Sequence, residues 1–268
     1  MTPGTSGDQL LMAIDVGNTH TVIGLYRGTS LEKHWRVVTE AERTADEYGM
    51  LFWNLFQASG MESPGISDVI LSSVVPPMTG VVVSLCRDYF HVDPLVVGPG
   101  VKTGMPILYD NPREVGADRI ANAVAGYERS GGATIVVDFG TATTLDYVTT
   151  GGEYVGGVIT PGIGISLDAL YRRTAKLPRV ELVKPRRVVG RSTVNAIQSG
   201  VVYGYVEMVD GLVRHIIRDE ELEDVFVVAT GGLASLIAAE SSTIREVDEF
   251  LTLDGLRIIN ERTRGDTG

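Results

Sequence analysis

Hydrophobic residues in the first half of the chain fall into runs of two distinct periods. Runs with alternating or β-branched positions predict strands, whereas apolar residues three and four positions apart predict amphipathic helices. Three strands separated by short turns open the chain and predict an antiparallel meander. The expected strands cover residues 10–16, 20–26, 32–38, 68–75 and 94–98, and the expected helices cover 44–60, 79–90 and 117–130.

The second half of the chain repeats this order of elements. An internal repeat is stronger evidence for the architecture than the assignment of any single helix or strand. We therefore expect an α/β protein of two tandem domains with like topology that face each other across a cleft. They would cover residues 10–131 and 132–264, with the boundary near Gly131 and Gly132. Strands are expected at 133–139, 142–148, 153–159 and 224–230, and helices at 165–177, 192–219, 232–240 and 253–263.

An Asp-x-Gly turn follows the first strand of each half. When Asp15 in MAIDVGNTHTVIGLY is laid over Asp138 in IVVDFGTATTLDYV, Gly17 falls on Gly140. Glycine lets the backbone of a tight turn approach a ligand, and successive N–H groups can cradle phosphate oxygens. The Asp can hold a cation, since Mg²⁺ prefers carboxylates, waters and phosphates. Either turn alone fits an ordinary hairpin, but two copies in a repeated domain favour a pair that grips one polyphosphate.

The composition is that of a globular protein with an acidic surface. Hydrophobic residues make up 44% of the chain, and the net charge of −11 argues against non-specific nucleic-acid binding. No apolar run approaches the ~18–20 residues of a membrane span, and residues 1–9 lack the basic and apolar regions of a secretory signal. We expect a cytoplasmic protein without nucleic-acid or membrane partners. The single cysteine, Cys86, is expected to be a buried small hydrophobe rather than a catalytic thiol.

Several common nucleotide and metal motifs are missing from the sequence. There is no G-x-x-x-x-G-K-[ST] phosphate loop and no G-x-G-x-x-G after a strand. Four histidines and one cysteine offer no zinc-ligand cluster of usual spacing. If the protein binds a nucleotide, the two Asp-x-Gly turns are the candidates.

These turns, with Thr230-Gly231-Gly232 after a buried strand, resemble the actin-like ATPase and sugar kinase superfamily, whose domains are ribonuclease H-like. In that superfamily the two turns bind phosphates and the later segment lies near the adenosine. Longer segments narrow the resemblance to type III pantothenate kinases, over nearly the whole chain. They are YDNPREVGADRIANAVAGYE (109–128), VVDFGTATTLDYV (136–148), GGVITPGIGISLDAL (156–170) and GRSTVNAIQSGVVYG (190–204).

This resemblance implies an activity and a set of site residues. The activity is ATP-dependent phosphorylation of pantothenate to 4′-phosphopantothenate, the first step of coenzyme A biosynthesis, by a homodimer that needs Mg²⁺ and a monovalent cation, K⁺ or NH₄⁺. Asp118 would be the catalytic base and Asp138 would bind the monovalent cation. The ATP-binding residues would be Asp15, Val16, Gly17, Asn18, Thr19, His20, Thr21, Val22 and Thr141, and the pantothenate-binding residues would be Tyr109, Gly116, Ala117, Asp118, Arg119 and Thr193.

Elementary chemistry supports these roles and leaves simpler alternatives open. Phosphoryl transfer depends on positioning and charge neutralisation, and Asp118 stands where a helix is expected to begin, which favours its ionised form. It could instead be only a helix-terminal carboxylate, and Arg119 only a surface charge. Tyr109 could be a partly buried turn residue and Thr193 a helix cap. The basic stretch 172–191 is either a solvated loop or an anion-facing lid, and His20 has no assigned acid–base role.

Two rival functions stay open from the sequence. The first is another small-molecule kinase of the same fold, which the GADR segment with Tyr109 disfavours. The second is a non-catalytic ATP-binding regulator, against which the retention of Asp118 and Asp138 argues. An actin-like filament protein is less favoured, because the chain is short for one.

Overall fold

The computed structural model describes residues 10–61 and 65–265, so the expectation about residues 1–9 lies outside the described part. The chain divides into two compact units by its internal contacts. The first holds the residues up to Met105, Asp110–Ala125 and the segment from Thr252, and the second holds Pro106–Tyr109 and Gly126–Leu251. Within the described ranges, no helix is long and apolar enough to cross a membrane.

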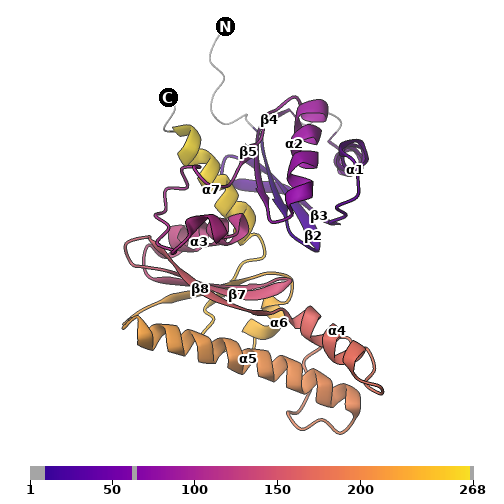
Figure 1. Ribbon diagram of the computed structural model, residues 1–268, viewed down its shortest axis with the longest axis vertical. Helices are drawn as coiled ribbons and strands as arrows, with labels where there is room; N and C mark the ends of the chain where they lie inside the picture. Colours follow the sequence, from indigo (N-terminus) through magenta and orange to yellow (C-terminus); the bar gives the residue numbers. More distant parts are fainter. Residues whose placement is uncertain (1–9, 62–64, 266–268) are drawn as a thin grey trace. The chain divides into compact units, whose positions relative to one another are not determined.

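A five-stranded mixed sheet forms the centre of the first unit (Figure 1). The strand order is β3-β2-β1-β4-β5. The first three strands pair antiparallel, as the meander predicts, and β4 and β5 add in parallel to β1. The strands are β1 (Leu10–Val16), β2 (His20–Arg27), β3 (Ser30–Val38), β4 (Ile66–Ser73) and β5 (Leu95–Val96).

Two helices, α1 (Ala45–Ala58) and α2 (Pro76–Phe90), pack their apolar residues into the core of this unit. Helix α1 begins at a capping box in which Thr44 and Glu47 satisfy each other's backbone N–H groups. Helix α2 begins three residues earlier than expected, because proline is well suited to a first helical turn that needs no N–H donor. Cys86 on α2 is fully buried, as predicted, and burial raises its pKa to about 12.

The second unit repeats the same sheet order, β10-β9-β6-β7-β8, with matching antiparallel and parallel pairs. The predicted internal repeat is therefore confirmed. Only the two-residue edge strand β10 was missed. The strands are β6 (Thr134–Phe139), β7 (Ala142–Val148), β8 (Tyr154–Pro161), β9 (Phe226–Thr230) and β10 (Glu246–Val247), and the helices are α4 (Ile163–Arg173), α5 (Thr193–Asp219) and α6 (Ala234–Ala238).

The two faces of this second sheet are covered by different helices. Ile135 and Val137 of β6 belong to the same core cluster as Val209 of α5, and Figure 1 shows α5 running along that side of the sheet. Val136 points to the opposite face, because side chains alternate along a strand. There the Gly126 backbone of α3 (Ala117–Ser130) packs so closely that a Cβ would lie 2.9 Å from the Val136 side chain.

The terminal helix α7 (Leu251–Gly265) groups with the first unit from Thr252 onward, although residues 253–264 were expected to belong to a C-terminal domain. Its contacts explain the difference. The Tyr26 hydroxyl of β2 donates to Asp254 at 2.8 Å, and the Thr252 hydroxyl donates to Asn122 of α3 at 2.7 Å. That residues 10–131 and 132–264 form two independent domains therefore remains a prediction.

The crossing of α7 and α3 within the first unit leads to a stability prediction. A Cβ on Gly255 would overlap the Ala121 carbonyl oxygen, so the two helix backbones touch at this position. Gly255→Ala should lower the free energy of unfolding by roughly 1–3 kcal/mol, because overpacking forces the backbones apart. Chemical denaturation measures this change. Gly200→Ala on α5, where nothing lies near the added methyl, is the control and should not destabilise.

Candidate functional site

The first Asp-x-Gly turn joins β1 to β2 through residues 17–19. The Gly17 N–H donates to the His20 carbonyl at 3.0 Å and closes the turn. A Cβ on Gly17 would lie 3.1 Å from that carbonyl, so the tight turn favours glycine. Asn18, Thr19 and His20 are exposed, and Gly17 is half-buried. Asn18, Thr19 and His20 are therefore accessible to a ligand, whereas the Gly17 N–H is used to close the turn.

Thr21 and its neighbours in the predicted ATP segment face inward. Thr21 and Val16 are fully buried, and the Thr21 hydroxyl shares a 2.9 Å hydrogen bond with the Thr39 hydroxyl. The Thr39 N–H also donates to the Thr19 carbonyl at 3.0 Å. In this structure Thr21 holds the end of β3 against the turn. Val22, opposite Asp15 on β2, is half-buried.

Asp15 occupies the end of β1, where the strand leaves the core. It is half-buried, with a buried Oδ1 atom, and it lies opposite Ser72 of β4 in the parallel register. The Ser72 hydroxyl is buried as well. Paired polar residues at adjacent strand ends are the arrangement expected beside a phosphate or cation site, because parallel α/β sheets bind ligands at the carboxyl ends of strands.

Asp118 lies in the first turn of α3, in the same unit as Asp15. Its Oδ1 accepts the backbone N–H of Arg119 at 2.8 Å. That oxygen occupies the space in which a Cβ on Gly116 would lie, so Gly116 leaves room for the carboxylate. The Val74 N–H donates to the Val16 carbonyl at 3.1 Å, and the Val74 side chain contacts this same space. A short path of contacts therefore connects the first turn to Asp118.

Arg119 and Ala117 complete the GADR segment. Ala117 is buried, and Arg119 is half-buried with a buried Nη2 atom. A guanidinium group with this degree of burial is not the solvent-facing charge of the simpler alternative. The guanidinium group of an arginine can donate two parallel hydrogen bonds to one carboxylate.

The second Asp-x-Gly turn joins β6 to β7 through residues 140–141. Asp138 is half-buried and pairs with Thr144 on one side and Thr230 on the other. Gly231, at φ +91°, lies so close that a Cβ would be 2.7 Å from Asp138 Oδ1, and a Cβ on Gly140 would be 3.4 Å away. The Asp138 carboxylate therefore sits between the turn and the TGG segment.

Thr141 is exposed at the tip of this turn, and its carbonyl accepts the Gly162 N–H at 3.2 Å. A Cβ on Gly162 would overlap the carbonyl oxygens of Gly140 and Thr141. Gly162 is also the N-cap of α4, so this helix begins directly against the turn. The glycine in the TPGIG segment thus has a packing role that the sequence did not reveal.

The Asp138 carboxylate and the Phe139 carbonyl oxygen both lie close to Gly231, and oxygen ligands of this kind suit a hard cation. A carboxylate, hydroxyls and backbone carbonyls are the ligand types that such cations prefer. Across the described ranges there is no group of three or more His, Cys, Asp or Glu residues that could hold a metal ion. A cation here would therefore rely on one carboxylate and on neutral oxygens.

Tyr109 packs on β8 in the second unit. Its ring lies 3.4 Å from the position of a Cβ on Gly156 and has its centroid 6.4 Å from that of Tyr154. Tyr109 is thus a half-buried residue held by strand contacts. The Tyr154 hydroxyl donates to the fully buried Asp146 at 2.6 Å.

Sequence reasoning missed Asp146. The available signal was an acidic residue at a core-facing position inside the apolar run LDYV. A charge buried at such a position needs hydrogen-bond partners, and the Thr144 hydroxyl is a second donor to it, at 3.1 Å.

Thr193 is the first residue of α5 and is exposed. The helix cap is Ser192, whose hydroxyl accepts the Asn195 N–H at 3.2 Å. The capping alternative therefore applies to Ser192 and leaves the Thr193 side chain accessible. The predicted site residues gather in two sets: Asp15 with its turn and Asp118 in the first unit, and Asp138 with Thr141 in the second.

The sequence model of the family "Type III pantothenate kinase" matches residues 11–215. A type III pantothenate kinase of Pelobacter propionicus is 56% identical over 255 residues, which cover 95% of this chain and 100% of that protein. Another, from Anaeromyxobacter dehalogenans strain 2CP-C, is 58% identical with the same coverage.

Solved structures share the fold at low sequence identity. A protein of Sinorhizobium meliloti described as a 2-dehydro-3-deoxygalactonokinase has a TM-score of 0.59 at 12% identity, covering 94% of this chain and 96% of its own. A protein of Campylobacter jejuni described as a Baf family transcriptional activator has a TM-score of 0.57 at 17% identity, covering 95% and 99%. These likenesses support the sugar kinase type of fold alone. The family model and the close relatives go further, and by them this chain belongs to the type III pantothenate kinase family.

Proposed function

We propose that the protein phosphorylates pantothenate with ATP, forming 4′-phosphopantothenate and ADP in the first step of coenzyme A biosynthesis. The observation that carries this function is the family match over residues 11–215, a range that includes the GADR segment at residues 116–119. The fold alone would not distinguish pantothenate from other acceptors, because one fold hosts many functions.

The first turn supplies the phosphate-binding groups. The exposed residues Asn18 and Thr19 would bind phosphate oxygens of ATP through backbone N–H groups and the Thr19 hydroxyl, with Thr141 as a further contact. Asp15 at the end of β1 would hold Mg²⁺ together with those phosphates. Bound Mg²⁺ supplies charge neutralisation on the transferred phosphoryl group.

Asp118 would act as the general base. The 4′-hydroxyl proton of pantothenate moves to a carboxylate oxygen of Asp118 while the hydroxyl oxygen forms a bond to the γ-phosphorus of ATP. The bond from that phosphorus to the bridging oxygen breaks, and the electron pair leaves with ADP. Because Asp118 Oδ1 is held by the Arg119 N–H, the carboxylate has a fixed direction from which to accept the proton.

Arg119 would bind the pantothenate carboxylate and offset the repulsion between an acidic protein and an anionic substrate. Arg119→Gln should raise the KM for pantothenate about tenfold or more, because a hydrogen bond to a charged group contributes about 1.5–3 kcal/mol. The KM for ATP should change little. Arg113→Gln, an exposed arginine of the same segment, is the control. Equal changes in both KM values for Arg119→Gln would contradict this placement.

The monovalent cation, K⁺ or NH₄⁺, would be held by Asp138. The close approach of Gly231 and Gly140 to the Asp138 carboxylate, with the Phe139 carbonyl oxygen beside Gly231, supports this role. The ion would supply positive charge next to the phosphates of ATP. The homodimer and the cytoplasmic location are also part of this proposal, and sedimentation of the purified protein tests the first of them.

One assay tests the function. The purified protein is incubated with ATP, Mg²⁺, K⁺ and pantothenate, and 4′-phosphopantothenate is measured by mass spectrometry. Product formation supports the proposal. ATP binding without product would favour the non-catalytic regulator, and phosphorylation of a sugar but not of pantothenate would favour another small-molecule kinase.

A further inference from the structure

The segment before α5 has no regular secondary structure, yet it is held firmly along that helix. The Gln198 side-chain amide donates to the Glu181 carbonyl at 2.8 Å, and the Tyr203 hydroxyl donates to the Pro185 carbonyl at 3.4 Å. The Ser199 hydroxyl donates to the Val188 carbonyl. Three residues of the helix, Gln198, Ser199 and Tyr203, therefore bind carbonyl groups of the loop backbone.

Gly190 fixes the end of the same loop. A Cβ on Gly190 would overlap the backbone of Asn195 and Ala196 in the first turns of α5. Because the loop backbone lies directly on the helix and Pro185 is buried, the conformation of residues 181–190 is determined by packing. The loop backbone therefore fixes the positions from which its side chains project.

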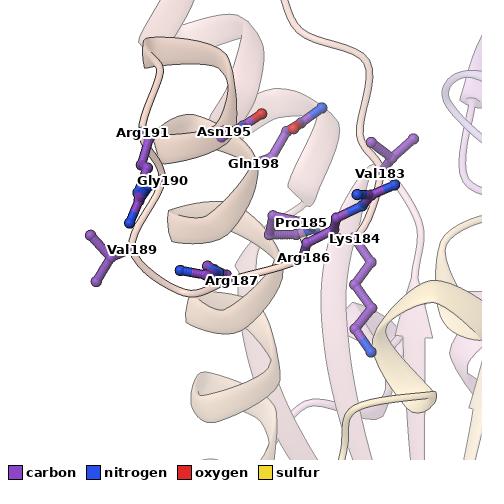
Figure 2. A pocket seen from close by; sticks show the side chains of 10 residues that line it. All are labelled: Val183, Lys184, Pro185, Arg186, Arg187, Val189, Gly190, Arg191, Asn195 and Gln198. Atoms are coloured by element: carbon purple, nitrogen blue, oxygen red, sulfur yellow. The ribbon is translucent and has the colours of Figure 1, made fainter.

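These side chains surround a cavity of about 380 Å³ between the loop and α5 (Figure 2). Arg186, Arg187 and Arg191 line it. In Figure 2, Arg186 lies next to Val183, and Arg187 and Arg191 lie farther along the loop. Lys184 differs from them, because it pairs with Glu240 at 2.5 Å.

The charge of this cavity is uncompensated. Among the described residues, Arg186, Arg187 and Arg191 have no ion-pair partner, and no acidic residue lines the cavity. This is unusual in a chain with a net charge of −11, in which most other arginines on the surface pair with Asp or Glu. The Ser192 cap already satisfies an N–H of the helix end, so the positive character comes from the guanidinium groups.

We propose that this cavity binds a small molecule that carries a phosphate or diphosphate group. Guanidinium groups bind phosphate oxygens through paired N–H donors, and the volume falls within the lower part of the range for small-molecule sites. Val183 and Val189 give the wall an apolar part that would contact the remainder of the ligand. The residues assigned to ATP and pantothenate, Thr193 included, are not among those that line it.

Pyrophosphate is the probe for this site. The protein is first saturated with a non-hydrolysable ATP analogue, so that the Asp-x-Gly turns are occupied, and pyrophosphate is then titrated by calorimetry. We expect one further site per chain. Arg187→Gln/Arg191→Gln should weaken its Kd at least tenfold, and Arg187→Lys, which keeps the charge but loses the fork, should weaken it by less.

Arg173→Gln/Lys176→Gln is the matched control, because it removes two exposed positive charges of the same unit outside the cavity. Its Kd should stay within twofold of the wild-type value. Absence of a pyrophosphate site, or an equal loss in both double variants, would overturn the inference. A third outcome would also overturn it: the wild type binds no pyrophosphate and Arg187→Gln/Arg191→Gln changes the sedimentation coefficient. That result would mean that a second copy of the chain covers the loop.

The pantothenate assay distinguishes this inference from the proposed function. Kinase activity without the additional pyrophosphate site would overturn the inference alone. Pyrophosphate binding in a protein that makes no 4′-phosphopantothenate would overturn the proposed function alone. Circular dichroism of each variant shows whether a lost site reflects misfolding, and in that case the single variant Arg187→Lys decides.

Discussion

Asp118→Asn is expected to lower kcat by roughly 10²–10⁴-fold, the usual contribution of a positioned general base. Asparagine keeps the size of the side chain and an Oδ1 atom that can still accept the Arg119 N–H, so the start of α3 and the space beside Gly116 should be preserved. The side chain loses only its capacity to take a proton. ATP and pantothenate should therefore bind with nearly wild-type affinity.

Steady-state kinetics measure the expected loss of kcat, and calorimetry measures the expected retention of ATP and pantothenate binding. Asp110→Asn removes an exposed carboxylate from the same segment and should leave kcat unchanged. If Asp118→Asn retains a near-normal rate, Asp118 is not the base. If it loses substrate binding as well, the aspartate serves mainly to hold the substrate.

Nine of the ten strands in the described part of the chain could be predicted from the sequence, because alternating or β-branched runs are typical of strands, whereas the two-residue strand β10 is too short to show such a pattern. The five strands of each unit follow the same order, and the helix at Ala117–Ser130 was predicted with its observed bounds. The repeat also told us that the two Asp-x-Gly turns occupy equivalent places, at the end of β1 and the end of β6.

The placement of α7 could not be predicted, because periodicity shows that a helix has an apolar face but not which face of which sheet receives it. The partners of α7, such as Tyr26 and Asn122, lie more than a hundred residues away in the sequence. The start of α2 at Pro76 was missed for a different reason. The prolines at positions 76 and 77 fit the end of a strand and the first turn of a helix equally well.

The sequence could predict which residues form the site, but not which atoms surround each of them. Sequence could propose Asp118 and Asp138, but it could not show that Gly116 and Gly231 leave space for those carboxylates. Nor could it separate Thr19, which is accessible, from Thr21, whose hydroxyl is committed to Thr39. Contacts between residues far apart in the sequence determine whether a side chain is accessible, and these contacts cannot be inferred from a single sequence.

Replacing K⁺ by Na⁺ at constant Mg²⁺ should reduce activity to near background. A bare Asp138 carboxylate beside the phosphates of ATP would repel them, and the acidic chain adds to that repulsion. A large, weakly hydrated cation held by Asp138 would turn the repulsion into an attraction, because a bound ion is the largest local charge in such a site. The smaller Na⁺ would not suit oxygen ligands fixed by the backbones of Gly140 and Gly231.

The variant Asp138→Asn separates this role from a general effect of salt. It should be slow in K⁺ and in Na⁺ alike, and its rate should no longer rise with K⁺ concentration. Asp224→Asn, which changes an exposed carboxylate before the opposite end of the neighbouring strand β9, should keep the wild-type response to K⁺. Equal wild-type rates in the two salts would contradict the cation role. The two Asp-x-Gly turns would then act only as phosphate-binding turns, and the Asp138 carboxylate would need another source of compensating charge, for which Mg²⁺ on the nucleotide is the available candidate.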